Sequence, residues 1–164
     1  RFESFVYAPV VPENITELTG ICADDLVGAP PLASVLERFR LFLGDSVFVA
    51  HNVKFDYGFI DASLQKCGFG MLLNRRLCTV ELARRTIEAQ RYGLGSLKEL
   101  LGVQNVHHRA FSDAVSCFEI FKSALSRLPW SVQSTEDLIL FSKTAKSLAL
   151  SRPQLSGCGE GEIL

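Results

Sequence analysis

Long hydrophobic runs, paired cysteines and a surplus of either charge are all missing from this 164-residue chain. No apolar run approaches the roughly 18 residues that a membrane-spanning helix needs, and no secretory signal pattern opens the sequence. The formal net charge of −1 gives no general attraction toward nucleic acid or an anionic membrane. The five cysteines are odd in number and include no C-x-x-C pair, which argues against a disulfide framework or a zinc site. This usage favours a reducing cytoplasm.

Positive charge is concentrated in residues 75–109, although the whole chain is nearly neutral. This stretch holds seven Arg or Lys residues against three Glu residues, a local charge of +4. Two interpretations stay open. The stretch is either a solvated helix face or a surface that contacts a phosphate backbone.

Short apolar runs alternate with helical patterns, which predicts an α/β fold. Strands are predicted at 2–7, 46–50 and 77–79, the second buried on both faces because it is nearly all apolar. Helices are predicted at 32–43, 54–68, 80–89, 96–102, 110–128 and 135–148, with a single helical turn before Gly20. Residues 1–128 are predicted to form one domain, and residues 129–164 a C-terminal helix followed by a loose tail.

Two acids, Asp56 and Asp113, are each predicted in the first turns of a helix on an otherwise apolar stripe. Asp56 also follows the buried strand directly, and open α/β sheets place active sites at that edge. Asp61, by contrast, lies on the polar side of its helix and is predicted at the surface. Either acid alone could simply favour the positive end of a helix dipole. Two inward carboxylates repel unless a cation lies between them, so the pair predicts Mg²⁺ or Mn²⁺ binding.

His108 precedes Asp113 by five residues, in the loop that leads into the helix. Imidazole titrates near neutral pH and could take a proton from a water beside a bound metal. Two metals and a histidine base are sufficient for phosphodiester hydrolysis. Taken alone, a histidine here is an ordinary polar residue at a helix start, and His107 is left in that category.

The segments V-F-V-A-H-N-V-K-F-D (47–56) and H-H-R-A-F-S-D-A (107–114) resemble motifs of the DEDDh 3′–5′ exonucleases. This family includes the proofreading epsilon subunit of bacterial DNA polymerase III, and the resemblance covers about residues 2–126. It implies an RNase H-like exonuclease fold, with helices flanking a mixed sheet. It also implies that Asp56 and Asp113 bind two Mg²⁺ or Mn²⁺ ions and that His108 is the catalytic base.

Four further residues match substrate-binding positions of the family: Thr19, Gly20, His51 and Asn52. The implied substrate is a single-stranded or frayed DNA 3′ end, hydrolysed during proofreading. The implied partner is the catalytic subunit of DNA polymerase III. The helix at 135–148 could dock on that partner or pack back on its own domain. The Q-L-S at 154–156 is only weakly similar to a sliding-clamp-binding peptide, and no membrane partner is expected.

The family's first motif, D-x-E-T on the first strand, has no counterpart in this sequence. Because the chain also begins with Arg1 rather than Met, we expect a fragment whose first two strands and two further metal carboxylates lie upstream. This chain alone is then expected to be inactive. The alternative is a non-catalytic truncated homologue that binds a polymerase or nucleic acid. An RNA substrate also stays open, because the sequence does not reveal how a 2′-hydroxyl would be read.

Overall fold

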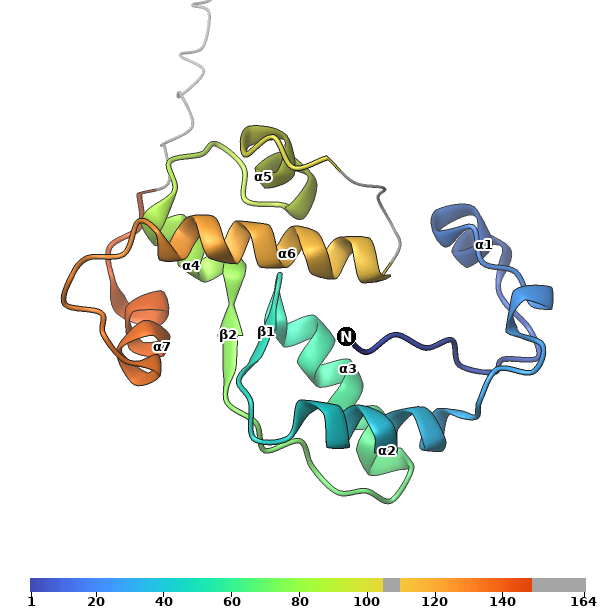
Figure 1. Ribbon diagram of the computed structural model, residues 1–164. Helices are drawn as coiled ribbons and strands as arrows, with labels where there is room; N and C mark the ends of the chain where they lie inside the picture. Colours follow the sequence, from blue (N-terminus) through green and yellow to red (C-terminus); the bar gives the residue numbers. More distant parts are fainter. Residues whose placement is uncertain (105–109, 149–164) are drawn as a thin grey trace, which may run out of the picture.

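The computed structural model describes residues 1–104 and 110–148 (Figure 1). Its elements are α1 (Glu13–Thr19), a 3₁₀ turn η1 (Asp24–Leu26), α2 (Leu32–Leu43), β1 (Phe48–Ala50), α3 (Val53–Lys66), β2 (Arg76–Cys78), α4 (Thr79–Thr86), α5 (Leu94–Leu100), α6 (Ala110–Leu125) and α7 (Thr135–Thr144). This alternation confirms the predicted α/β class. Among these helices, none is both long enough and apolar enough to cross a membrane.

The two strands pair in parallel, in the register Phe48↔Arg76, Val49↔Leu77 and Ala50↔Cys78. Helix α3 makes the crossover between them, as a parallel connection requires. Because the strands run in the same direction, the segments that leave them meet at one edge of the sheet. Figure 1 shows α6 crossing that edge, and the first turns of α6 share a cavity with the end of β1.

Residues 2–7 form no strand, so that prediction is wrong. A strand is held by a ladder of backbone hydrogen bonds, and neither described strand runs alongside this segment. It is held instead by the Tyr7 N–H, which donates to the Pro30 carbonyl at 2.9 Å. The Phe2 ring adds packing against Phe39 and Phe42 of α2, with centroids 5.7 and 5.6 Å away.

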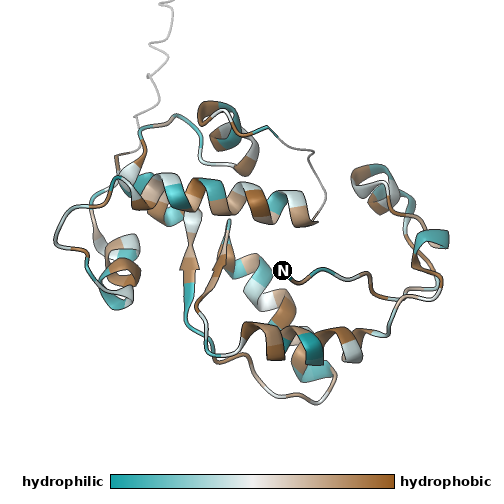
Figure 2. Cartoon of the chain, viewed as in Figure 1, coloured by the Kyte–Doolittle hydropathy of each residue, from teal (hydrophilic) through white to brown (hydrophobic). Residues whose placement is uncertain are grey.

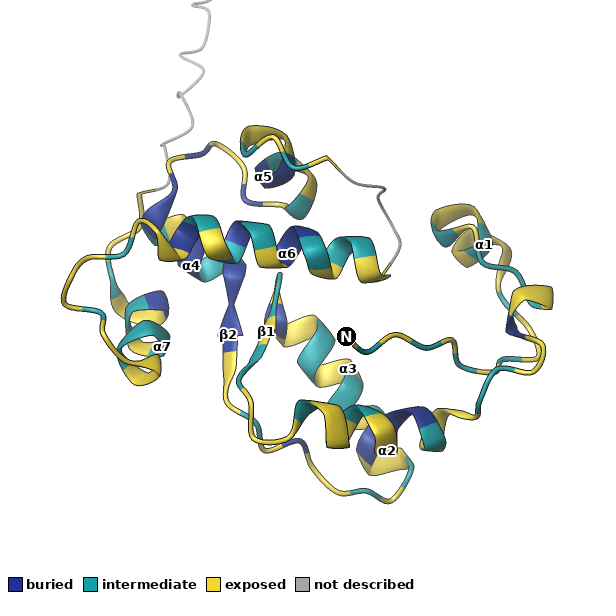
Figure 3. Cartoon of the chain, in the orientation of Figure 1, coloured by how far each residue is buried: buried dark blue, intermediate teal, exposed yellow. Residues whose placement is uncertain are grey.

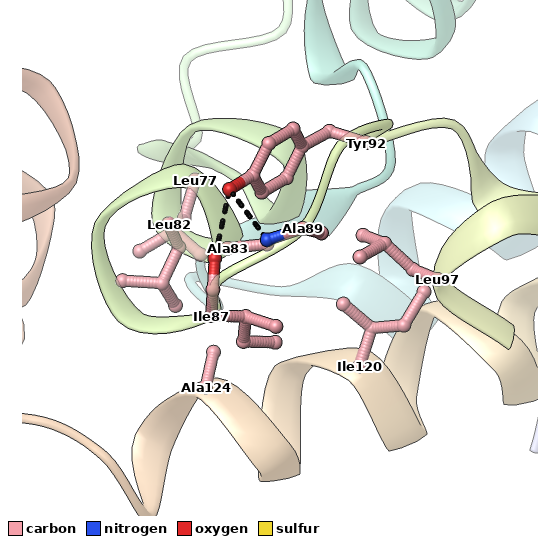
Figure 4. Packing of buried hydrophobic residues seen from close by; sticks show 9 residues of the cluster. All are labelled: Leu77, Leu82, Ala83, Ile87, Ala89, Tyr92, Leu97, Ile120 and Ala124. Atoms are coloured by element: carbon pink, nitrogen blue, oxygen red, sulfur yellow. Dashed lines mark hydrogen bonds between the residues drawn. The ribbon is translucent and has the colours of Figure 1, made fainter. Parts of the chain in front are cut away.

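Among the described residues, buried side chains form two hydrophobic clusters. Figure 3 shows the buried residues along α2, β2, α4, α5 and α6. The larger cluster joins β2, α4, α5 and α6 and contains Leu77, Leu82, Ala83, Ile87, Ala89, Tyr92, Leu97, Ile120 and Ala124 (Figure 4). The smaller cluster contains Leu36, Leu64 and Leu72, with Phe48, Tyr57 and Ile60 packed against it. Thus α6 belongs to one cluster, and α3 belongs to the other.

Helix α6 alternates apolar and polar residues along its length (Figure 2). Its buried face carries Cys117, Ile120 and Ala124, which is the stripe that Asp113 heads. Phe118, in contrast, is exposed. On β1, Val49 is 36% exposed, so the prediction of a strand buried on both faces is wrong. Val49 lines the cavity between β1 and the first turns of α6, so its side chain stays partly accessible to solvent.

Helix ends agree only partly with the sequence patterns. Helix α2 ends at Gly44, whose φ of 50° suits glycine. Helix α5 begins at Leu94, two residues before the predicted start at residue 96, and its N-cap Gly93 offers no side chain. Helix α7 starts with a capping box: the Asp137 N–H donates to the Ser134 hydroxyl, and Asp137 accepts the Ser134 N–H in return.

Three side chains on α3 and α7 make contacts within the fold. Asp61 is half-buried and accepts the Leu72 N–H at 2.6 Å, so it anchors the loop after α3 and is not the free surface acid predicted. On α7, Leu138 and Phe141 pack against the larger cluster. The following segment is tied down as well, because the Leu148 N–H donates to the Arg84 carbonyl at 2.6 Å.

Candidate active site

A cavity of about 440 Å³ lies where the carboxyl end of β1 meets the first turns of α3 and α6. Its polar lining consists of His51, Asn52, Asp56 and Asp113, with the Cys117 thiol beside them. The two acids come from separate helices, 57 positions apart in the chain. The structure therefore brings together the four predicted site residues that flank the sheet edge.

Asp56 is held in the cavity because α3 begins at Val53, immediately after β1 and its tight connection. Removal from solvent raises the pKa of the Asp56 carboxyl above its ordinary value, and a hydrogen bond from its own backbone N–H partly opposes that rise. Burial disfavours the charged form of a carboxylate unless a positive group is nearby. The cavity thus holds a partly desolvated acid for which a cation would be a favourable neighbour.

Asp113 contributes a second carboxylate to the cavity. Its Oδ1 atom is buried and has no hydrogen-bond partner among the described residues. Buried polar atoms are nearly always paired, and leaving one unpaired is unfavourable. A bound cation would satisfy this oxygen.

The chemistry of the two acids fits a divalent metal ion. Mg²⁺ in particular is usually bound through one or two carboxylates, with the remaining ligands from water and substrate phosphates. The described residues contain no group of three or more His, Cys, Asp or Glu side chains placed to hold a metal. The described part of the chain therefore supplies two carboxylates to such a site.

His51 uses both ring nitrogens inside the protein. Nδ1 lies 2.9 Å from the Thr79 hydroxyl and Nε2 lies 2.9 Å from the Tyr92 carbonyl. Burial lowers the pKa of His51, although the bond to the Tyr92 carbonyl opposes this. Sequence reasoning missed Thr79, which is fully buried. Its signal was available, because Thr79 follows β2 just as His51 follows β1.

Asn52 is the N-cap of α3 and has a φ of 69°, the one positive φ at a non-glycine position among the described residues. This left-handed conformation is disfavoured for most L-residues but is tolerated by Asn. Strained backbone often marks a functional site. Here it turns the chain sharply from β1 into α3, so that Asp56 comes within reach of the cavity.

Thr19 and Gly20 lie elsewhere. Thr19 lines a separate, mostly apolar cavity of about 610 Å³ between the N-terminal segment and α1, and Gly20 is the C-cap of α1 with φ 68°. Ala110, at the start of α6, lines both cavities, so the two are neighbours. His107 and His108 fall in 105–109, outside the described residues.

The basic stretch at 75–109 is largely engaged within the fold. Five of its six described basic residues make these contacts: Arg75 pairs with Glu136, Arg76 lies over the Tyr57 ring, Arg84 lies over the Tyr92 ring, Arg85 donates to the Glu81 carbonyl, and Lys98 is buried. Arg75, Arg76, Arg84 and Arg91 nevertheless stay exposed, so both interpretations of the stretch remain predictions. A phosphate backbone would have to compete with these contacts for the same cations.

Comparison with known proteins identifies the class. Residues 4–121 match the exonuclease family RNase_T. The DNA polymerase III PolC-type proteins of Staphylococcus aureus strains MW2 and USA300 are each 42% identical to this chain over 111 residues. That region is 66% of this chain but only 8% of the relative, so the chain spans about 8% of the length of these curated relatives.

The fold is consistent with that of an RNase H-like exonuclease, as the sequence predicted. Within that class, the chain belongs to the RNase_T exonuclease family. The predicted relation to the DEDDh proofreading exonucleases of DNA polymerase III is confirmed. The relatives found are PolC-type polymerases, in which the matched region is a small part of a much longer chain.

Proposed function

We propose that this chain is the catalytic region of a metal-dependent 3′–5′ exonuclease that acts on DNA during proofreading. One observation carries the proposal: in a member of an exonuclease family, Asp56 and Asp113 line a single cavity, and a buried oxygen of Asp113 has no hydrogen-bond partner among the described residues. Phosphodiester hydrolysis requires stabilisation of the developing negative charge on the attacked phosphate. A cation held between these two acids would provide it.

In this proposal Asp56 and Asp113 hold Mg²⁺ or Mn²⁺, two ions in the complete site. When bound, the ions activate water and neutralise charge on the phosphate. His108 accepts a proton from the attacking water, and its place five residues before Asp113 favours that role. Asn52, at the rim of the cavity, would contact the terminal nucleotide, and Thr19 and Gly20 would do so from the neighbouring cavity.

The biological setting is proposed from the relatives. The substrate would be a single-stranded or frayed DNA 3′ end, and the partner a DNA polymerase III, either as an epsilon-type subunit or within a PolC-type chain. The exposed Leu140 on α7 leaves room for a polymerase contact on that helix. Contact with a sliding clamp is a weaker proposal, since the Q-L-S segment lies outside the described residues. Free thiols at Cys22, Cys67, Cys78 and Cys117 support a cytoplasmic location.

The test is Mn²⁺-dependent release of nucleotides from a 5′-labelled primer with a 3′ mismatch. Both residues 1–164 and a form extended at its N-terminus by a segment that carries the family's D-x-E-T motif should be assayed. We expect stepwise shortening by the extended form, abolished by Asp113→Asn and retained in the matched variant Asp61→Asn. A parallel RNA primer distinguishes the two substrate classes. Activity of residues 1–164 alone would support the exonuclease but contradict the need for further carboxylates.

His108→Ala in the active form should reduce turnover by about 10²–10⁴-fold, the usual contribution of a general base. DNA binding, measured by fluorescence anisotropy in Ca²⁺, should change far less. Equal losses of turnover and binding would contradict the base role.

A second function has one observation in its favour. Because the described residues contain no metal cluster of three or more side chains, the chain could be a binding module that retains the fold without catalysis. Failure of both forms to release nucleotides, with polymerase or DNA binding intact, would establish this alternative and overturn the proposal.

A further inference from the structure

We propose that His51, Thr79 and Cys117 form a hydrogen-bonded relay that sets the position of Asp56 relative to Asp113. The inference rests on the proposed function and assigns positioning residues to the same site. It replaces contact with substrate as the main role of His51, because neither of its ring nitrogens is left for a ligand.

The relay links the end of β1 to α4 and α6. His51 lies at the end of β1, five residues before Asp56, and its Nδ1 lies 2.9 Å from the Thr79 Oγ1 atom at the start of α4. Thr79 Oγ1 lies 3.6 Å from the Cys117 Sγ atom on α6. Cys117 is one helical turn after Asp113, on the same face of α6. Three side chains therefore connect the backbone of one acid to the backbone of the other.

The directions of the hydrogen bonds follow from the partners. A carbonyl can only accept, so Nε2 of His51 donates its proton to the Tyr92 carbonyl. In the neutral ring, Nδ1 then accepts the proton of the Thr79 hydroxyl at 2.9 Å, in preference to the Ala50 carbonyl, which lies 3.4 Å from the same oxygen. That hydroxyl has no second proton, so the Cys117 thiol donates to Thr79 Oγ1.

The acceptor at Tyr92 is itself held firmly. The Tyr92 hydroxyl donates to the Ile87 carbonyl at 2.8 Å and accepts the Ala89 N–H at 3.3 Å, inside the larger cluster (Figure 4). His51 is thus fixed at one nitrogen by the loop before α5 and at the other by the start of α4. Because its ring is hydrogen-bonded at both nitrogens, His51 restricts the position of the backbone that leads from it to Asp56.

The division of the core explains why such a relay matters. Asp113 is carried by α6, which packs in the larger cluster, whereas Asp56 is carried by α3, which packs in the smaller one. Apolar packing within each cluster does not by itself fix the distance between the two acids. The three-residue ladder between β1 and β2 connects the parts of the chain that carry the two acids. The relay adds directional hydrogen bonds beside the cavity.

The test uses three variants on one helix. Thr79→Val removes the hydroxyl with almost no change of shape, and Thr79→Ser keeps it. Thr86→Val is the matched control, because Thr86 is also buried on α4 and its hydroxyl also bonds, to the Leu82 carbonyl at 3.0 Å, but it does not contact the site. Two readouts are needed: Mn²⁺ affinity by EPR titration, and amide exchange at Tyr57 and Gly58 of α3 without metal.

We expect Thr79→Val to weaken Mn²⁺ binding by about tenfold or more, the usual effect of removing a group that orients a ligand. It should also speed exchange at the two α3 amides. Thr79→Ser should restore both, and Thr86→Val should leave both near the wild-type values.

Equal effects of Thr79→Val and Thr86→Val would overturn the relay, since they would reflect general loss of stability. Faster exchange without weaker Mn²⁺ binding would also overturn it, because α3 would then move without consequence for the acids. If the wild-type chain bound no Mn²⁺, the proposed function would fail. The metal-free exchange difference would still decide whether the relay places α3.

Discussion

Replacing Asp56 by asparagine should raise the stability of the metal-free protein. Burial raises the pKa of this carboxyl, so the native state binds a proton more tightly than the unfolded chain, whose ordinary value is about 3.9. Ionisation therefore opposes folding. The penalty is absent at pH values below about 3.9, grows as the pH rises through the native pKa, and is constant above it. Asparagine has nearly the same shape and no charge.

The expected gain is small. A full pKa unit corresponds to about 1.4 kcal/mol, but the Asp56 side chain is only half-buried and water screens its charge. We therefore expect a gain of about 0.5 kcal/mol at pH 7.5, which corresponds to about 1–2 °C in Tm for a chain of this size. At pH 4 the gain should largely disappear.

Excess Mn²⁺ should make the wild-type protein more stable than Asp56→Asn, the reverse of the order without metal. At ten times the Kd, a ligand that binds only the native state adds about 1.4 kcal/mol, or about 3–5 °C. Wild type should gain this in excess Mn²⁺, and Asp56→Asn should gain much less, since one of two described carboxylates is gone. Thermal unfolding by circular dichroism, in EDTA and in Mn²⁺, measures both effects.

Asp61→Asn, on the same helix, is the control. Asp61 accepts hydrogen bonds from the Leu72 N–H and from Gln65, so this variant should lose stability in EDTA and keep the response to Mn²⁺. If Asp56→Asn were less stable than wild type in EDTA, or gained as much from Mn²⁺, the reasoning about Asp56 would be refuted.

Three further predictions concern the surroundings of the site. Burial lowers the pKa of His51, so the stability that the neutral His51 ring contributes is complete above the unfolded value of about 6.5 and is lost as the pH falls through the native pKa. The free energy of unfolding in urea should therefore decrease with falling pH over this range, and His51→Gln should reduce that decrease. Leu138→Ala should cost about 1–2 kcal/mol because Leu138 packs on the larger cluster, whereas Leu140→Ala, at a side chain 61% exposed, should stay within about 0.5 kcal/mol. Ser134→Ala should cost about 1 kcal/mol by removing the cap that Asp137 N–H uses; equal Tm values for variant and wild type would contradict that role.

Local patterns predicted most of the helices and the placement of the two acids. Helix α2 and the buried stripe of α6 follow from the spacing of apolar residues, which acts within a few turns. Asp56 and Asp113 share a cavity because each is in the first turn or so of a helix at the same edge of the sheet. The rule about where strands end placed Asp56 at this edge, whereas Asp113 was predicted there from its inward position on a helix.

The errors came from interactions between distant segments. Residues 2–7 have the composition of a strand, but a strand also needs a neighbour, and composition does not supply one. The partial exposure of Val49 likewise depends on how distant segments are arranged around β1. Thr79 is not singled out by its local sequence, because a β-branched residue beside a strand is ordinary. The hydrogen bond of its hydroxyl to His51 joins residues 28 positions apart, so only the folded chain shows it.

Because the core is divided into two clusters, experiments can separate effects on stability from effects on metal binding. Substitutions inside one cluster, such as those at Leu82 or Leu64, should lower stability while the surviving native molecules keep both acids in place. Substitutions in the relay act on the relation between the clusters, so they should disturb metal binding more than stability. The geometry of this site therefore depends less on the size of the hydrophobic core than on a few polar bonds that cross between its two parts.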